Sequence, residues 1–238
     1  MLYMGGDIMT GKKLMMCVII GVGAGMIMGN VLKVSTVETF GNHGITILLD
    51  AGHGSPDGGT TGVDGTVEKD INLKIALKTQ EVLEGKGIHV LMTRDDDKGL
   101  QDEKDNTIRE MKVSDMNKRL DIMKKSNADL FLSIHMNSFP SKTVSGLRIF
   151  YSKEHEAVKM LAEDMQINIS KVTGAKSYAV KTADEKLFLM KNPPMPAILA
   201  ECGFLSNPEE EKLLNDEKYQ SKIAWAIADA IEKYYINR

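Results

Sequence analysis

The sequence predicts an α/β fold: a single domain with a mostly parallel twisted sheet flanked by helices on both faces. Short, nearly continuous apolar runs alternate along the chain with longer segments whose apolar residues recur at helical spacing. Three of these runs end at a residue that can bind a metal or accept a proton, namely His53, His135 and Glu201. Because sites in open α/β sheets form beyond the carboxyl ends of the strands, we expect the three side chains to converge there.

An N-terminal hydrophobic segment precedes the predicted domain. Residues 1–13 form a short cytoplasmic n-region that ends in two lysines, and residues 14–32 are apolar and uncharged. About twenty apolar residues can span a bilayer, and no small-residue cleavage pattern follows, so a membrane anchor is favoured over a cleaved signal peptide. Residues 33–44 are then a linker, and the domain at 45–238 is expected to be extracytoplasmic, either membrane-anchored or secreted.

The composition is that of an ordinary globular chain of 238 residues with a formal net charge of -3. This charge gives no basic footprint of the kind that nucleic-acid binding requires, so nucleic acid is excluded as a partner. The two cysteines, Cys17 and Cys202, cannot form a disulfide framework. We interpret Cys202 as a small buried hydrophobic residue rather than a nucleophile.

The first strand–loop–helix unit follows the linker. Ile45–Leu49 is almost continuously apolar, as expected for a strand covered on both faces. The stretch from Gly52 to Gly65 is rich in glycine and must be irregular, with glycines at positions that need special backbone angles. A helix is expected from about Glu68 to Gly85, with Ile71 and Ile75 on its apolar stripe.

The middle of the chain predicts two more strands and one helix. Strands are expected at Ile88–Met92 and Leu130–His135. Residues 95–111 are polar enough to form a long surface loop, either solvated or a surface for an accessory protein. The helix is expected near Ser114–Ser126, with Ser114 as its N-cap.

The last part of the chain continues the alternation. A strand is expected at Leu147–Tyr151 and a helix at Glu154–Val172, which Gly174 would end. A short buried strand at Ala197–Ala200 follows prolines that exclude a helix. The final helix is expected at about Ser221–Tyr235.

The candidate site residues suit a catalytic zinc ion, which typically has three protein ligands from His and carboxylate side chains. His53 and His135 would supply two nitrogens, and Glu68 is attractive as the third ligand because it begins the helix after the glycine loop. Glu201 follows four apolar residues, and a buried acid is costly unless it is paired or functional. Other carboxylates remain alternatives for the third ligand: Asp50, Asp57, Asp64 and Asp70.

Five sequence segments carry a family resemblance. They are Leu-Asp-Ala-Gly-His-Gly-Ser-Pro-Asp-Gly-Gly (49–59), Val-Glu-Lys-Asp-Ile-Asn-Leu (67–73), Leu-Met-Thr-Arg (91–94), Ala-Asp-Leu-Phe-Leu-Ser-Ile-His-Met-Asn (128–137) and Pro-Ala-Ile-Leu-Ala-Glu-Cys-Gly-Phe-Leu-Ser-Asn-Pro-Glu-Glu (196–210). In this order they closely resemble the zinc-dependent N-acetylmuramoyl-L-alanine amidases of the Amidase_3 type. The resemblance implies His53, Glu68 and His135 as ligands of Zn²⁺, and Glu201 as the catalytic carboxylate.

The activity implied by the resemblance is hydrolysis of the amide bond between N-acetylmuramic acid and L-alanine. The partners are then peptidoglycan glycan strands with their stem peptides. The sequence departs from the family pattern at Met136–Pro140, where small residues are commoner in the family. The wall of the substrate site formed by this segment is therefore expected to differ in shape.

A narrower resemblance is to the germination-specific spore-cortex amidases. It rests on the compact domain behind a hydrophobic segment and on the run Leu187–Pro196. It implies action on cortex peptidoglycan in support of muramic-lactam formation and germination, with the space between the forespore membranes as a candidate location. The alternatives are a zinc deacetylase or carboxypeptidase on wall polymers, or a non-catalytic wall-binding module. The ordered motifs and the four retained site residues favour the amidase.

Overall fold

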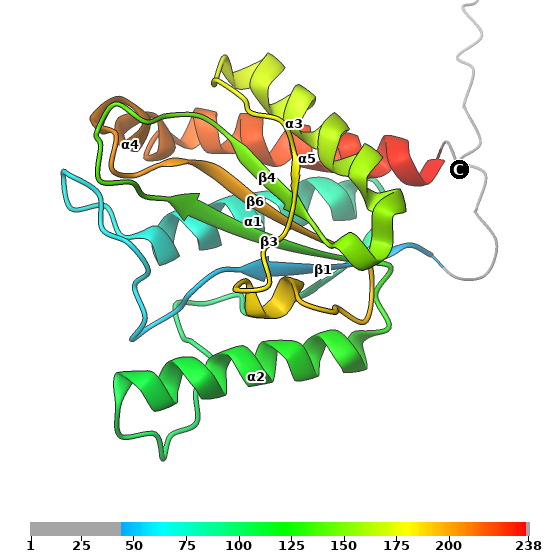
Figure 1. Cartoon of the computed structure of the whole chain (residues 1–238). Helices are drawn as coiled ribbons and strands as arrows, with labels where there is room; N and C mark the ends of the chain where they lie inside the picture. The colour runs from blue at the N-terminus through cyan, green and yellow to red at the C-terminus, as the bar shows by residue number, and fades with distance from the viewer. Residues whose placement is uncertain (1–43, 237–238) are drawn as a thin grey trace, which may run out of the picture. The chain divides into compact units, whose positions relative to one another are not determined.

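The computed structural model describes residues 44–236 (Figure 1). The predicted n-region, the hydrophobic segment and nearly all of the linker lie outside the described residues. Within residues 44–236, no helix is long and apolar enough to cross a membrane.

A six-stranded sheet in the order β2-β1-β3-β6-β4-β5 forms the centre of the described domain. Only β4 and β6 pair in the antiparallel direction among these strands, and the other neighbours are parallel. The predicted mostly parallel sheet is therefore confirmed. The strands are β1 Thr46–Ala51, β2 His89–Met92, β3 Leu130–Asn137, β4 Arg148–Tyr151, β5 Lys181–Thr182 and β6 Ala197–Phe204.

Helices cover both faces of the sheet, as predicted (Figure 1). On one face lie α1 (Glu68–Gly85), α3 (Lys159–Thr173) and α5 (Glu217–Ile236). The other face carries α2 (Ile108–Ser126), with the short 3-10 helix η2 (Phe188–Met190) between it and the strands. Two small elements complete the described chain: the 3-10 helix η1 (Lys153–Val158) and α4 (Pro208–Leu214).

Alternate strand residues supply two buried cores, one on each face of the sheet, which explains why the strand sequences read as continuous apolar runs. On the α2 face, Leu48, Phe131 and Leu199 pack with Met123 of α2 and Leu189 of η2. The strand residues adjacent to these in sequence point to the opposite face, where they pack with Ile75 of α1 and Ile227 of α5. They include Leu49, Leu132, Ile134, Ile198 and Ala200. Polar residues that share the α2 face with Phe131 and Leu199 are therefore the ones that can build a site there.

The predicted start of α2 is wrong. The helix begins at Ile108, where Thr107 and Glu110 form a reciprocal capping box. The Glu110 backbone N–H donates to Thr107 Oγ1 at 3.2 Å, and the Thr107 N–H donates to Glu110 Oε2 at 3.0 Å. Ser114 is not the cap, because its hydroxyl binds Asp105. Apolar spacing did not indicate these first turns, because they are exposed and their apolar residues Ile108 and Val113 face solvent.

Short elements account for the other differences. β5, η2 and α4 were not predicted, because segments of two to seven residues carry too little periodicity. The signal for α4 lies in its cap: Pro208 begins the helix, and the Asn207 side chain accepts hydrogen bonds from two backbone N–H groups. The final helix begins at Glu217, four residues before the predicted start.

The capping box of α2 gives a test of the fold. We expect Thr107→Ala to lower the free energy of unfolding by about 1 kcal/mol, since it leaves the Glu110 N–H without its acceptor. Glu110→Gln should be much milder because glutamine can keep the reciprocal bond. Urea denaturation measures the free energy of unfolding of both variants. Equal stability of wild type and Thr107→Ala would place the start of the helix elsewhere.

Candidate metal centre

The carboxyl ends of three neighbouring strands bring the predicted site residues together. β3 and β6 are paired so that His135 lies directly opposite Glu201. β1 pairs with β3 and ends at Ala51, two residues before His53. His135 and Glu201 continue the side of the sheet that carries Phe131 and Leu199, so both point to the α2 face. The convergence predicted from the strand ends is therefore present.

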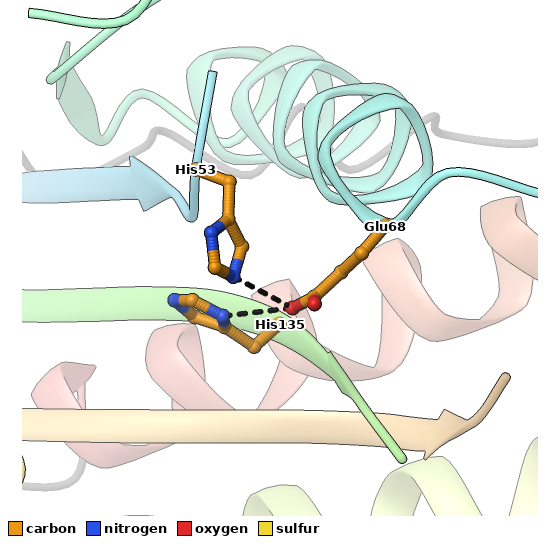
Figure 2. A group of neighbouring side chains, drawn as sticks. All are labelled: His53, Glu68 and His135. Atoms are coloured by element: carbon orange, nitrogen blue, oxygen red, sulfur yellow. Dashed lines mark hydrogen bonds and ion pairs between the residues drawn. The ribbon is translucent and has the colours of Figure 1, made fainter. Parts of the chain in front are cut away.

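His53, Glu68 and His135 form a compact cluster, with one potential ligand atom from each residue lying within 4.8 Å of the others. Figure 2 shows both imidazole rings directed at the carboxylate of Glu68, which comes from the start of α1. Glu68 Oε1 lies 3.2 Å from His53 Nε2 and 2.9 Å from His135 Nδ1. The two rings are 4.9 Å apart between centroids. Two nitrogens and one oxygen are a donor set found at catalytic zinc sites.

Surrounding groups fix the orientation of this cluster. Asp57 Oδ2 lies 2.9 Å from His53 Nδ1, so the other ring nitrogen of His53 faces Glu68. The Met136 backbone N–H donates to Glu68 Oε1 at 3.2 Å, and the Thr60 N–H donates to Oε2 at 2.8 Å. Such second contacts hold metal ligands in place and set the histidine tautomer.

The pKa shifts indicate that the Glu68 carboxylate is ionised and that it stabilises positive charge on His53. Burial alone would raise the pKa of Glu68, but hydrogen bonds from His135 and His53 hold it well below its ordinary value. Burial would lower the pKa of His53, but its contacts with Asp57 and Glu68 raise it to about 9. The cluster therefore offers a preformed anionic oxygen between two imidazoles.

Two glycines make room for the side chains of the cluster. A Cβ atom on Gly52 would lie 2.1 Å from His135 Nε2, and one on Gly59 would lie 2.5 Å from Glu68 Oε2. The expectation of special backbone angles is confirmed for Gly54 and Gly59, whose φ angles are 143° and 72°. It is wrong for Gly52 and Gly58, neither of which has a positive φ; at Gly52 the close approach of the His135 ring is the reason for glycine.

Two buried arginines hold the loop between β1 and α1. Arg94 donates to the carbonyl oxygens of Ala51 and Gly52 at 2.8 and 3.0 Å. Arg119 donates to the carbonyl oxygen of His53 at 2.6 Å. His53 has a φ of 63°, an uncommon left-handed conformation for a non-glycine residue, and these contacts stabilise the backbone around it.

The alternative third ligands have other roles or positions. Asp50 forms a buried ion pair with Arg119, and Ser133 Oγ donates to Asp50 Oδ2 at 2.6 Å. Burial would raise the pKa of Asp50, but Arg119 and these hydrogen bonds lower it. Asp57 contacts His53 from outside the cluster, and neither Asp64 nor Asp70 belongs to it. Glu68 is therefore the carboxylate that the described structure places between the histidines.

Glu201 lies beside this cluster with an unused oxygen. Its Oε2 is buried and has no hydrogen-bond partner within the described residues. Burial, reinforced by the negative charge of Glu68, raises the pKa of Glu201 to about 6. A carboxyl group with a pKa near neutrality is suited to accept and return a proton. Cys202, the next residue, is fully buried on the opposite face, where burial raises the pKa of its thiol.

A cavity of about 360 Å³ opens onto these groups. His53, His135 and Glu201 lie on its wall with apolar residues of the sheet, α2 and η2. Lys112 and Lys186 add positive charge to the lining. The site thus combines a polar reaction centre with a mostly apolar pocket, as small-molecule and substrate sites usually do.

The fold and this centre together define a hydrolytic enzyme built at the carboxyl edge of an α/β sheet. Residues 47–233 match the family model described as N-acetylmuramoyl-L-alanine amidase, and the chain belongs to this Amidase_3 family. The predicted family and its peptidoglycan-hydrolysing activity are confirmed, and the match favours an amidase over a deacetylase, a carboxypeptidase or a non-catalytic module.

Individual relatives agree with this assignment. The germination-specific N-acetylmuramoyl-L-alanine amidase of Bacillus subtilis is 35% identical over 199 residues, which cover 82% of this chain and 81% of the relative. Among solved structures, the CwlD amidase from Clostridioides difficile, in complex with the GerS lipoprotein, is 42% identical, with a TM-score of 0.78 over 82% of this chain and 100% of that one. The catalytic domain of CwlV from Bacillus (Paenibacillus) polymyxa is 31% identical, with a TM-score of 0.70 over 82% of this chain and 99% of that domain.

The space at Gly52 gives a test of the centre. We expect Gly52→Ala to displace the His135 ring, because no room exists for the added methyl group, and to weaken divalent-metal binding by about 10–100-fold. Gly85→Ala is the matched control, since a Cβ there meets nothing within 4 Å. Isothermal titration calorimetry with Zn²⁺ measures the metal affinity of both variants. Unchanged affinity in Gly52→Ala would mean that His135 is not held as described.

Proposed function

We propose that this chain is a zinc-dependent amidase in which His53, Glu68 and His135 hold the metal and Glu201 transfers the proton. The observation that carries the proposal is the pairing of His135 with Glu201 on adjacent strands. It places an unpartnered, buried carboxylate oxygen beside a cluster of two nitrogens and one oxygen. Zinc fits this cluster because the donor set, its compactness and its hydrogen-bonded surroundings are those of a catalytic zinc site.

The residues of the chain divide the reaction between them. A bound zinc ion would supply Lewis-acid activation of the scissile carbonyl and of water. Glu201 accepts a proton from the attacking water molecule while the oxygen of that water bonds to the lactyl carbonyl carbon. When the C–N bond breaks, Glu201 returns that proton to the departing amine of L-alanine. The products are a free lactyl carboxylate on N-acetylmuramic acid and a peptide with a free L-alanine amino group.

We infer that the substrate is spore-cortex peptidoglycan and that the cleavage supports muramic-lactam formation and germination. The name of the Bacillus subtilis relative as germination-specific supports this narrower role. Such a substrate requires an extracytoplasmic enzyme, in agreement with the predicted membrane anchor or signal peptide at residues 14–32. Because the similar CwlD amidase was solved in complex with a lipoprotein, an accessory protein is part of the proposal.

Glu201→Gln tests the proposed proton transfer. We expect the variant to bind zinc normally but to hydrolyse muropeptides about 10²–10⁴-fold more slowly, because the amide cannot accept the water proton. Mass spectrometry of digested peptidoglycan measures the release of peptides with free L-alanine termini, and metal analysis gives the zinc content. Undiminished hydrolysis would remove Glu201 from the mechanism.

His135→Ala tests the proposed metal ligand. Loss of one of three protein ligands should abolish stoichiometric zinc and hydrolysis together. The control is His89→Ala, because His89 is an exposed residue of β2 outside the cluster. Zinc bound at one equivalent in His135→Ala would contradict ligation by this residue. A chelator should inactivate the wild-type enzyme, and added Zn²⁺ should restore it.

A further inference from the structure

A row of three polar residues crosses the sheet at the reaction centre. His135 on β3 pairs with Glu201 on β6, and Glu201 pairs with Arg148 on β4. Arg148 shares the α2 side with Glu201, since directly opposite residues of an antiparallel pair point to the same face. Arg148 therefore extends the site along β4, away from the histidine cluster.

Arg148 is held by aromatic rings, and its positive charge also acts on the neighbouring Glu201. Its guanidinium carbon lies 4.2 Å from the centre of the Tyr178 ring and 5.7 Å from that of Phe204. A second cation, Lys176 Nζ, lies 4.9 Å from the Tyr178 ring. Within residues 44–236, neither cationic group makes a hydrogen bond or an ion pair. Stacking leaves the N–H groups of the guanidinium available for an anion.

The segment that carries Lys176 and Tyr178 is fixed against β4. The Leu147 N–H donates to the carbonyl oxygen of Lys176 at 2.7 Å. Leu147 also forms a bridge with Ser177, and a Cβ atom on Gly146 would lie 2.4 Å from the same carbonyl oxygen. The backbone that carries Lys176 and Tyr178 is thus fixed beside β4, the strand on which Arg148 pairs with Glu201.

We infer that Arg148, assisted by Lys176, binds a carboxylate of the stem peptide and so determines substrate specificity. This inference rests on the proposed function of the neighbouring centre. Two strand spacings separate Arg148 from His135, roughly 10 Å. An extended peptide covers that distance in about three residues. In the intact substrate the lactyl group is amide-bonded and the sugars carry no charge, so the anion that these cations meet there is a carboxylate within the first few residues of the peptide.

The test compares two N-acetylmuramoyl-tripeptides that differ only in whether the carboxylates beyond L-alanine are free or amidated. We expect the wild type to prefer the free acid and Arg148→Gln to lose about tenfold in kcat/KM on it, through KM, because one charge-assisted contact is removed. The variant should process the amidated compound as the wild type does. Arg148→Lys should keep part of the preference, since it keeps the charge but not the planar fork.

Lys181→Gln is the control, because it removes an exposed lysine of the neighbouring strand β5 and should leave the preference unchanged. Zinc content and thermal unfolding of each variant establish that the fold is retained. If Arg148→Gln instead slows both substrates equally through kcat, or if the wild type does not distinguish them, the inference is overturned. A wild type that cleaves neither substrate would overturn the proposed amidase centre itself, and this inference with it.

Discussion

The contact on which the rest of the site depends is the carboxylate of Glu68 between two imidazole rings. One oxygen, Oε1, lies within 3.2 Å of a ring nitrogen of both His53 and His135. Each partner comes from a different element, namely the loop after β1, the start of α1 and the end of β3. A buried carboxylate is costly unless it is compensated, and here two rings and two backbone N–H groups compensate it. The same arrangement leaves a compact set of donors for a cation.

Buried polar groups hold the backbone of the loop that carries His53. Arg94 and Arg119 together bind the carbonyl oxygens of three consecutive residues, Ala51 to His53. Arg119 is itself held by the buried Asp50, which Ser133 of the next strand also contacts. Breaking such a network would leave a buried charge uncompensated, which costs several kcal/mol. The precision of the metal centre thus depends on residues that would not themselves bind the metal.

Particular residues show what the sequence could and could not predict. The strand ends predicted that His53, His135 and Glu201 converge, because apolar runs mark parallel strands and parallel strands share a carboxyl edge. The choice of Glu68 over the neighbouring aspartates needed the family motifs, since spacing along a loop does not give distances in space. The start of α2 was missed because its first turns are exposed, with Ile108 and Val113 facing solvent, although Thr107 and Glu110 carry the capping signal. The role of Arg148 was not predicted, because it follows from strand register, which pairs residues distant in the sequence.

We propose that Glu68, and no other carboxylate, completes the metal site with the two histidines. A crystal structure of the zinc-loaded protein, with anomalous scattering recorded at the zinc edge, tests it most directly. We expect one zinc ion bonded to His53, Glu68 and His135 at about 2.0–2.2 Å. Zinc bonded through Asp57 instead of Glu68, or bound away from the two histidines, would contradict it.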